Sequence, residues 1–229
     1  MCGRFLAASD PDDLVRLFEV DDRRADEIAA SYNVAPTMSV YAIAEHERRR
    51  HLVSFRWGLV PNWADDAKGA ARMINARAET VADKPAYRTA LQRRRCLIPA
   101  DGFYEWQVSP RGRTPYFIHR AGGAPLAFAG LWDGWRQPDG TWLRTCTIVT
   151  TQAAPRLRGL HERMPVVLAQ DSWERWLDRG ERRPAAALAV LAAPASDDLV
   201  WHEVGTDVNN VRNDRPDLVA AVTHSETST

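Results

Sequence analysis

Short runs of β-branched and aromatic residues dominate this chain and follow one another with few helical segments between them. Such runs favour strands, and strands that succeed each other directly favour antiparallel pairing. The segment RQPDG between two of the runs has the composition of a hairpin turn. We therefore predict an α+β fold of mostly antiparallel sheet with peripheral helices. The runs are VYAIA, HLVSFRWGLV, CLIPADGFYEW, TPYFIHR, LAFAGLWDGW, TWLRTCTIVT and LVWHEV.

Three short segments read as helices. In SDPDDLVRLF, Asp10 is a candidate cap, Pro11 falls in the first turn, and apolar residues then share one face. YRTALQRRR from Tyr87 and DSWERWLDRG from Asp171 to Gly180 are the other two, the last with a glycine placed to end it. The alanine-rich AAALAVLAAPA is interpreted as an ordinary buried segment.

The chain has 229 residues, of which 45% are hydrophobic, enough for one core. No linker divides it, so we expect a single domain over residues 2–220 and a polar, disordered tail over 221–229. No run approaches the length of a membrane span, and no basic-then-apolar leader opens the sequence. The three cysteines lack paired spacing, so we expect free thiols, no metal and no cofactor in a soluble cytoplasmic protein.

The net charge of zero conceals a basic middle between acidic ends. Lys68 and Lys84 are the only lysines among the 30 basic residues, and the others are arginines. Arginine binds phosphate through a bidentate fork and stacks on flat rings. Phosphate binding and a bias in genome composition explain this pattern equally well.

Cys2 directly follows the initiator methionine. A small residue at position 2 usually allows that methionine to be trimmed, which would leave Cys2 with a free amine beside its thiol. An α-amine has a pKa of about 7.7–8.0, so part of it is an unprotonated nucleophile near neutral pH. An aldehyde can then form an imine with the amine, and the thiol can close a thiazolidine. Cys96 and Cys146 lie in apolar strand patterns and are expected to be small buried side chains.

Asn75, Glu105 and His161 are candidate partners for Cys2, each with a structural alternative. Asn75 in MINARAET could hold a substrate oxygen or an amine, or could be a turn residue. Glu105 in GFYEWQ could be a general acid of raised pKa among aromatic rings, or could face solvent by strand alternation. His161 in LHERMP could transfer protons, or could be structural. Five further histidines compete with it: His46, His51, His119, His202 and His224.

Nine tryptophans are many for this length. We expect most of them, including Trp132, Trp135 and Trp142, to pack in cores and on sheet faces. Trp57 and Trp63 bracket the segment GLVPN in the basic region. Exposed rings beside arginines there would form a stacking platform for unpaired bases.

Taken together, eight blocks of the sequence resemble the SOS-response-associated peptidase (SRAP) family of abasic-site processing proteins. They run in order from residue 2 to about residue 214. The resemblance implies a barrel-like core. The blocks are MCGR, YNVAPT, RWGLVPNWA, NARAET, CLIPADGFYEW, AGLW, HERMPVVL and VNNVRND.

The resemblance also implies a function, namely binding of single-stranded DNA that contains an abasic site and a covalent cross-link to it through Cys2. Asn75 would hold the reacting atoms, Glu105 would be the acid and base, and His161 would assist ring opening and reversal. The name peptidase would reflect release of Met1, which we expect the protein itself to catalyse. We expect a monomer, cytoplasmic or nucleoid-associated on damaged DNA, with no membrane partner. The DNA contacts would come from Arg4, Arg77, Arg163 and Trp63.

Three other functions remain open from the sequence. An N-terminal-nucleophile amidohydrolase also begins with Met-Cys-Gly and uses the thiol against an amide. A cysteine peptidase would pair Cys2 with His161. A non-enzymatic DNA-binding module would leave Cys2 incidental.

Overall fold

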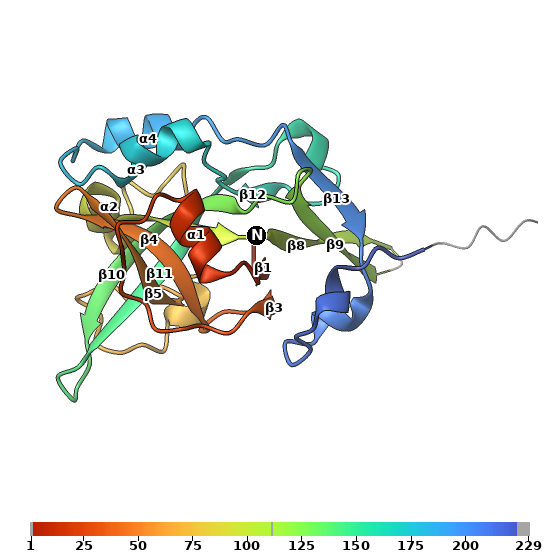
Figure 1. The fold of residues 1–229 in the computed structure, drawn as a ribbon, viewed down its shortest axis with the longest axis horizontal. Helices are drawn as coiled ribbons and strands as arrows, with labels where there is room; N and C mark the ends of the chain where they lie inside the picture. Colours follow the sequence, from red (N-terminus) through yellow and green to blue (C-terminus); the bar gives the residue numbers. More distant parts are fainter. Residues whose placement is uncertain (1, 111, 224–229) are drawn as a thin grey trace, which may run out of the picture.

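A computed structural model describes residues 2–110 and 112–223, whose strands form two sheets (Figure 1). The smaller sheet stands beside the larger one, and β1 is among its strands nearest the larger sheet (Figure 1). Most neighbouring strands are antiparallel, and three pairs are parallel, which confirms the predicted α+β class of mostly antiparallel sheet. The smaller sheet has the order β13 (Leu199–Glu203), β9 (Gly112–Arg120), β8 (Gly102–Ser109), β1 (Phe5–Ala7), β3 (Ser31–Val34). The larger has the order β12 (Arg163–Pro165), β11 (Trp142–Gln152), β10 (Leu126–Arg136), β7 (Arg95–Ala100), β4 (Ser39–His46), β5 (Arg49–Trp57), β2 (Asp22–Arg23), and β6 (Asn75–Arg77) pairs with β11.

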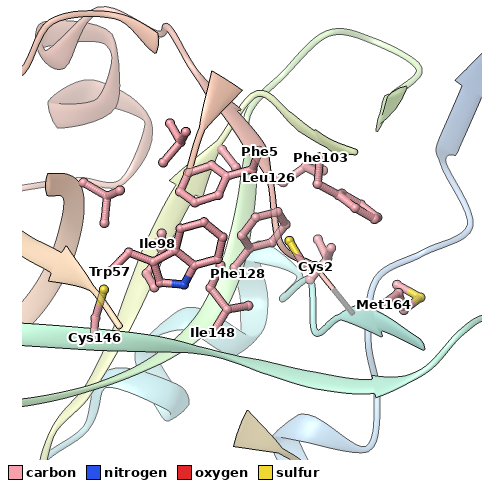
Figure 2. Packing of buried hydrophobic residues seen from close by; sticks show 14 of the residues in the cluster. Cys2, Phe5, Trp57, Ile98, Phe103, Leu126, Phe128, Cys146, Ile148 and Met164 are labelled. Atoms are coloured by element: carbon pink, nitrogen blue, oxygen red, sulfur yellow. The ribbon is translucent and has the colours of Figure 1, made fainter. Parts of the chain in front are cut away.

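The larger sheet closes on itself because β11 pairs with β10 on one side and with β5 on the other. Strands β11, β10, β7, β4 and β5 therefore form a closed barrel, hereafter the barrel. Successive side chains of a strand point to opposite faces, so every second residue faces the interior. Those residues form one apolar cluster, which includes Trp57, Ile98, Phe128, Cys146 and Ile148 (Figure 2).

The run CLIPADGFYEW supplies two strands in different sheets. β7 ends at Ala100 in the barrel, and β8 begins at Gly102 in the smaller sheet. Asp101 stabilises the turn between them because its Oδ2 accepts hydrogen bonds from Ala8 N at 2.6 Å and Ser9 N at 2.9 Å. This turn brings the start of the chain against the joint of the two sheets.

The helices cover the outer face of the barrel, where a second apolar cluster separates them from the strands (Figure 1). The predicted cap at Asp10 is confirmed, since its side chain accepts from Asp12 N at 2.7 Å. The alanine-rich segment was not predicted as a helix, yet it forms α4. The α-helices are α1 (Pro11–Leu17), α2 (Pro85–Arg93), α3 (Trp173–Leu177) and α4 (Pro184–Leu191). The 3-10 turns are η1 (Ala70–Arg72), η2 (Pro155–Leu157), η3 (Gln170–Ser172), η4 (Thr206–Asn209) and η5 (Pro216–Val219).

The predicted tail begins with ordered pairing. Ala221 forms an antiparallel bridge with Val204, and Val222 N donates to Glu203 O at 3.0 Å. Residues 224–229 of the predicted tail lie outside the described residues. Among the residues that the structure describes, none of the helices has the length and apolar character needed to cross a bilayer.

Of the two expected locations, Trp142 takes a sheet face, where its ring lies over Gly134, and not a core. Trp142 begins β11 after the predicted RQPDG turn, and its side chain is 65% exposed. The hairpin of β10 and β11 extends past the barrel, so its outer residues have no opposing strand to cover them. Trp135 is buried as predicted, and Trp132 is half-buried.

Two glycines of β10 test how tightly the barrel is packed. A Cβ on Gly130 would lie 2.8 Å from Cys96 Sγ, whereas the nearest atom to a Cβ on Gly134 is 3.5 Å away. We expect Gly130→Ala to lower the free energy of unfolding by about 1–3 kcal/mol through overpacking. Gly134→Ala should be neutral or stabilising by up to about 1 kcal/mol. Urea denaturation of both variants checks this, and equal stabilities would contradict the packing described.

Candidate active site

Cys2 is fully buried at one end of the barrel cluster, with 0% of its surface exposed. It lies between Phe103 and Met164, while Cys146 lies at the far side of the same cluster (Figure 2). Its carbonyl oxygen accepts a hydrogen bond of 2.7 Å from Asn75 Nδ2. Chain termini usually fray, so this burial and this bond give the second residue an unusually fixed position.

Asn75 is a strand residue rather than a turn residue. It opens β6 and pairs with Ile148 of β11. Trp57 Nε1 donates to the preceding carbonyl, Ile74 O, at 3.0 Å, and Tyr87 Oη donates to Asn75 O at 3.3 Å. Asn75 Oδ1 is buried and accepts no hydrogen bond from the described residues. The side chain therefore holds Cys2 with its amide nitrogen and keeps a buried acceptor beside it.

Glu105 lies on β8 and is only 4% exposed, so the alternative that it faces solvent is wrong. Burial disfavours the charged carboxylate and raises the pKa of Glu105 to about 7. Its charge also acts on Cys2, whose thiol pKa it raises. A carboxyl group with this pKa can give or take a proton near neutral pH.

The Cys2 thiol has a pKa raised well above its ordinary value, chiefly because it is buried and secondarily because Glu105 is close. A thiol is nucleophilic mainly as its thiolate. At neutral pH the sulfur in this position is therefore protonated. Cys96 and Cys146 are also buried and free, as predicted.

His161 stands in the turn before β12, where its Nδ1 accepts from Arg163 N at 2.9 Å. A neutral ring that accepts at Nδ1 carries its proton on Nε2. Partial burial lowers the pKa of His161, which favours this neutral form. Glu105 and His161 line one small cavity of about 10 Å³, together with Phe103 and Met164. Phe103 and Met164 also flank Cys2 (Figure 2), so Cys2, Glu105 and His161 lie close together.

Arg163 is engaged by an acid of the protein. Its Nη1 and Nη2 donate to Glu79 at 3.1 and 3.0 Å, and Nη2 also donates to Thr150 O at 2.7 Å. The hydrogen bond from Arg163 lowers the pKa of Glu79 and keeps it ionised. A phosphate at Arg163 would have to displace this carboxylate.

Of the two tryptophans predicted to form a stacking platform, only Trp63 is exposed. Trp57 is fully buried and belongs to the barrel core, whereas Trp63 is 64% exposed. The loop that carries Trp63 is held in place, since Asn62 N donates to Asp133 Oδ2 at 3.1 Å and Trp135 Nε1 donates to Ala64 O at 2.6 Å. Arg77, at the end of β6, is also exposed.

Arg4 joins the start of the chain to the C-terminal segment. Its Nη1 donates to Asn33 Oδ1 at 2.7 Å and to Val208 O at 2.9 Å, and its guanidinium lies 5.9 Å from the centre of the Trp106 ring. Asn33 Nδ2 in turn donates to three carbonyls, including Asn213 O at 2.8 Å. The sequence reasoning missed Asn33, although its block YNVAPT was noticed. The signal available in the sequence was an asparagine placed between Tyr32 and Val34 in a strand-like run.

No group of three or more metal-ligating side chains is arranged around a common point within residues 2–110 and 112–223. The site accordingly consists of an amide, a carboxyl, an imidazole and a thiol at the end of an apolar barrel.

The sequence profile of the family described as SOS response associated peptidase (SRAP) matches residues 1–211. The chain belongs to the SRAP family. It is 39% identical over 221 residues to the abasic site processing protein YoqW of Bacillus subtilis, covering 96% of this chain and 99% of that protein. It is 31% identical over 265 residues to the abasic site processing protein HMCES of Xenopus tropicalis, covering 97% and 78%.

Solved structures share the SRAP fold of this chain. A Bacteroides thetaiotaomicron protein superposes with a TM-score of 0.86 at 22% identity, covering 97% of this chain and 100% of that one. A Bordetella bronchiseptica protein gives a TM-score of 0.76 at 27% identity, covering 89% and 100%. The barrel with its attached sheet is thus a recurring architecture.

Glu105 makes a specific contribution to the pH dependence of stability. Its folded-state pKa of about 7 exceeds the ordinary value of 4.5, so the folded chain binds this proton more tightly. The resulting stabilisation is present below about pH 4.5 and is lost as the pH rises through about 7. Relative to the wild type, Glu105→Gln should gain roughly 2–3 kcal/mol between pH 4.5 and pH 8. Urea denaturation across this range measures the difference, and a constant difference would refute the assignment.

Proposed function

We propose that this protein binds single-stranded DNA at an abasic site and forms a covalent thiazolidine link to it through Cys2. The observation that carries the proposal is the convergence of Cys2, Asn75 and Glu105 at one end of the barrel. The curated relatives are named abasic site processing proteins, which supports the same substrate.

The amine of Cys2 becomes available only when the Met1–Cys2 bond is cleaved. We propose that Met1 is released before the reaction, and that the protein itself catalyses this cleavage. Glu105 suits this step, because a carboxyl with a pKa of about 7 can activate water and then protonate the leaving amine. This single cleavage accounts for the word peptidase in the family description.

Ring opening of the abasic sugar is the first chemical step on DNA. A closed hemiacetal opens to an aldehyde when its ring oxygen gains a proton and its hydroxyl loses one. Protonated Glu105 can supply the first proton, and the raised pKa keeps a useful fraction protonated near neutral pH. We assign to His161 the assisting proton transfer, because its neutral ring shares the small cavity with Glu105.

Capture of the aldehyde then uses both nucleophiles of Cys2. The amine attacks C1′, water leaves to give an imine, and the thiol adds to the same carbon while its proton moves to the nitrogen. The raised pKa of the thiol supports this order, because a protonated sulfur is the weaker competitor for the first attack. Asn75 would hold the residue in position through its bond to Cys2 O. The closed ring removes the imine, which would otherwise promote strand cleavage by β-elimination.

The DNA strand would run past the exposed Arg77 and Trp63. Trp63 offers a stacking surface and Arg77 a phosphate contact. Arg163 joins them if a phosphate replaces Glu79, and we assign to Arg4 chiefly a positioning role at the joint of the sheets.

A cysteine peptidase or amidohydrolase would need the Cys2 sulfur as its first nucleophile. The burial that raises the thiol pKa and lowers the His161 pKa opposes a thiolate–imidazolium pair. These functions are therefore less well supported than the cross-link.

Denaturing electrophoresis with an abasic single-stranded oligonucleotide tests the proposal. The wild type should give a stable shifted species. Cys2→Ser and Cys2→Ala keep a terminal amine but lack the thiol, so they should give a labile imine that survives denaturation only after borohydride reduction. Urea denaturation shows whether each variant is folded.

The matched control is the wild-type sequence with an uncleaved N-terminal tag, which retains the thiol and lacks the free amine. It should form no shifted species with or without borohydride. A stable adduct formed by the tagged protein, or by Cys2→Ala without borohydride, would exclude the mechanism. Consumption of glutamine by the wild type would instead favour the amidohydrolase.

A further inference from the structure

The end of the barrel remote from Cys2 opens into a second cavity, of about 170 Å³. Along β11, Arg144 lies at this cavity, and Thr150 contacts Arg163 beside the candidate active site. They are six positions apart along the strand, or about 20 Å. The cavity is therefore distinct from the site at Cys2, and we call it the barrel mouth, defined by His51, Phe55, Trp132 and Arg144 with Arg24 and Arg179 at its rim.

The floor of the barrel mouth is aromatic. Phe55 and Trp132 stack with ring centres 5.2 Å apart and planes inclined by 20°. Both are inward-facing residues of the barrel, where Val53 and Ala44 complete the apolar lining. Trp132 is only half-buried, so part of the indole faces the cavity. This surface suits a flat, aromatic ring.

The lining of the barrel mouth is positively charged, with three arginines against one acid, Glu45. Arg24 pairs with Asp22 at 2.7 Å, and Arg179 Nη1 donates to Glu45 O at 3.4 Å. Arg144 is exposed, and its side chain makes no hydrogen bond or ion pair with any described residue. Its guanidinium is thus available to an anion beside the aromatic floor.

His51 adds a buried polar group to the same cavity. Its side chain is 4% exposed, and its Nδ1 lies 3.5 Å from Asp22 Oδ2 without forming a hydrogen bond within the described part of the chain. A buried ring nitrogen that lacks a hydrogen bond costs free energy unless a ligand or water satisfies it. The mouth therefore combines an aromatic floor, an exposed arginine side chain and a buried imidazole.

The large cleft beside the barrel mouth has a different character. Its cavity of about 940 Å³ is lined by six arginines and six acidic residues, so its charges compensate one another. The barrel mouth instead continues onto the exposed hairpin, where Arg136 and Trp142 pair on the face that carries Arg144. Rings and arginines thus extend from the mouth in one direction.

We propose that the barrel mouth binds one nucleotide unit, with its base stacked on Trp132 and its phosphate on Arg144. The cavity is smaller than the roughly 300–1,000 Å³ of pockets for drug-sized ligands, and a single heterocyclic ring matches it better. The unit is either a free nucleotide or an unpaired residue of a strand lying along the hairpin. The proposal does not depend on the chemistry at Cys2.

Nuclear magnetic resonance of the full chain tests the proposal through the indole N–H signal of Trp132, assigned with Trp132→Phe. The probes are deoxythymidine monophosphate, whose base is a single ring, and an undamaged single-stranded oligothymidylate, neither of which can react with Cys2. We expect the signal to shift with at least one probe, and Arg144→Glu to weaken that binding about tenfold or more through loss of a charge-assisted contact. A shift at lower concentration with the nucleotide identifies a free ligand, and the reverse identifies a strand.

Arg113→Glu is the matched control, since it makes the same charge change on an exposed strand residue of the smaller sheet. It should bind both probes like the wild type. The proposal is overturned if neither probe shifts the Trp132 signal, or if Arg144→Glu and Arg113→Glu bind alike. If Arg144→Glu loses its fold by circular dichroism, Arg144→Gln replaces it with the same expectation of weaker binding.

Discussion

The hydrogen bond from Asn75 Nδ2 to Cys2 O, made where Cys2 is fully buried, is the contact on which the rest of the account depends. A reactive group at the second residue needs a fixed position, and the ends of chains are normally the least fixed part of a fold. Here β1 pairs with both β3 and β8 within a few residues of Cys2. Phe5 packs edge-on against Trp57 at 5.0 Å and anchors this strand to the barrel.

The same burial sets the protonation states of the site. Removing Glu105 from water raises its pKa to about 7, and removing Cys2 from water keeps its thiol protonated. Both effects follow from the cost of placing a charge in an apolar region. One apolar environment thus provides a carboxyl group that can exchange a proton near neutral pH, and it keeps the thiol protonated until the proposed addition to the imine.

Local sequence patterns predicted correctly those features of the fold that depend on interactions between residues close in the chain. The cap at Asp10, the RQPDG turn and the strand runs depend on residues close in the chain, whereas the burial of Glu105 was left open by the sequence. The eight sequence blocks identified the family. The alanine-rich segment gave no clear helical periodicity, because α4 packs with small side chains that lack a strong polar face.

Predictions failed or stayed open where distant segments decide the outcome. Trp57 is buried because β1 places Phe5 against it. Trp142 is exposed because the β10–β11 hairpin extends beyond the barrel. The DNA contact expected of Arg163 stays a prediction, and the sequence did not predict that Glu79 from another segment pairs with its guanidinium. The barrel mouth was invisible in the sequence, since its residues come from four strands and two connections.

Peptide mapping by tandem mass spectrometry after reaction with abasic DNA tests the central claim most directly. The account predicts an adducted peptide that begins at Cys2, lacks Met1, and carries the sugar with the loss of one water, with both nitrogen and sulfur blocked. Retention of Met1 in the adducted molecules, or attachment of the sugar to any other residue, would contradict it.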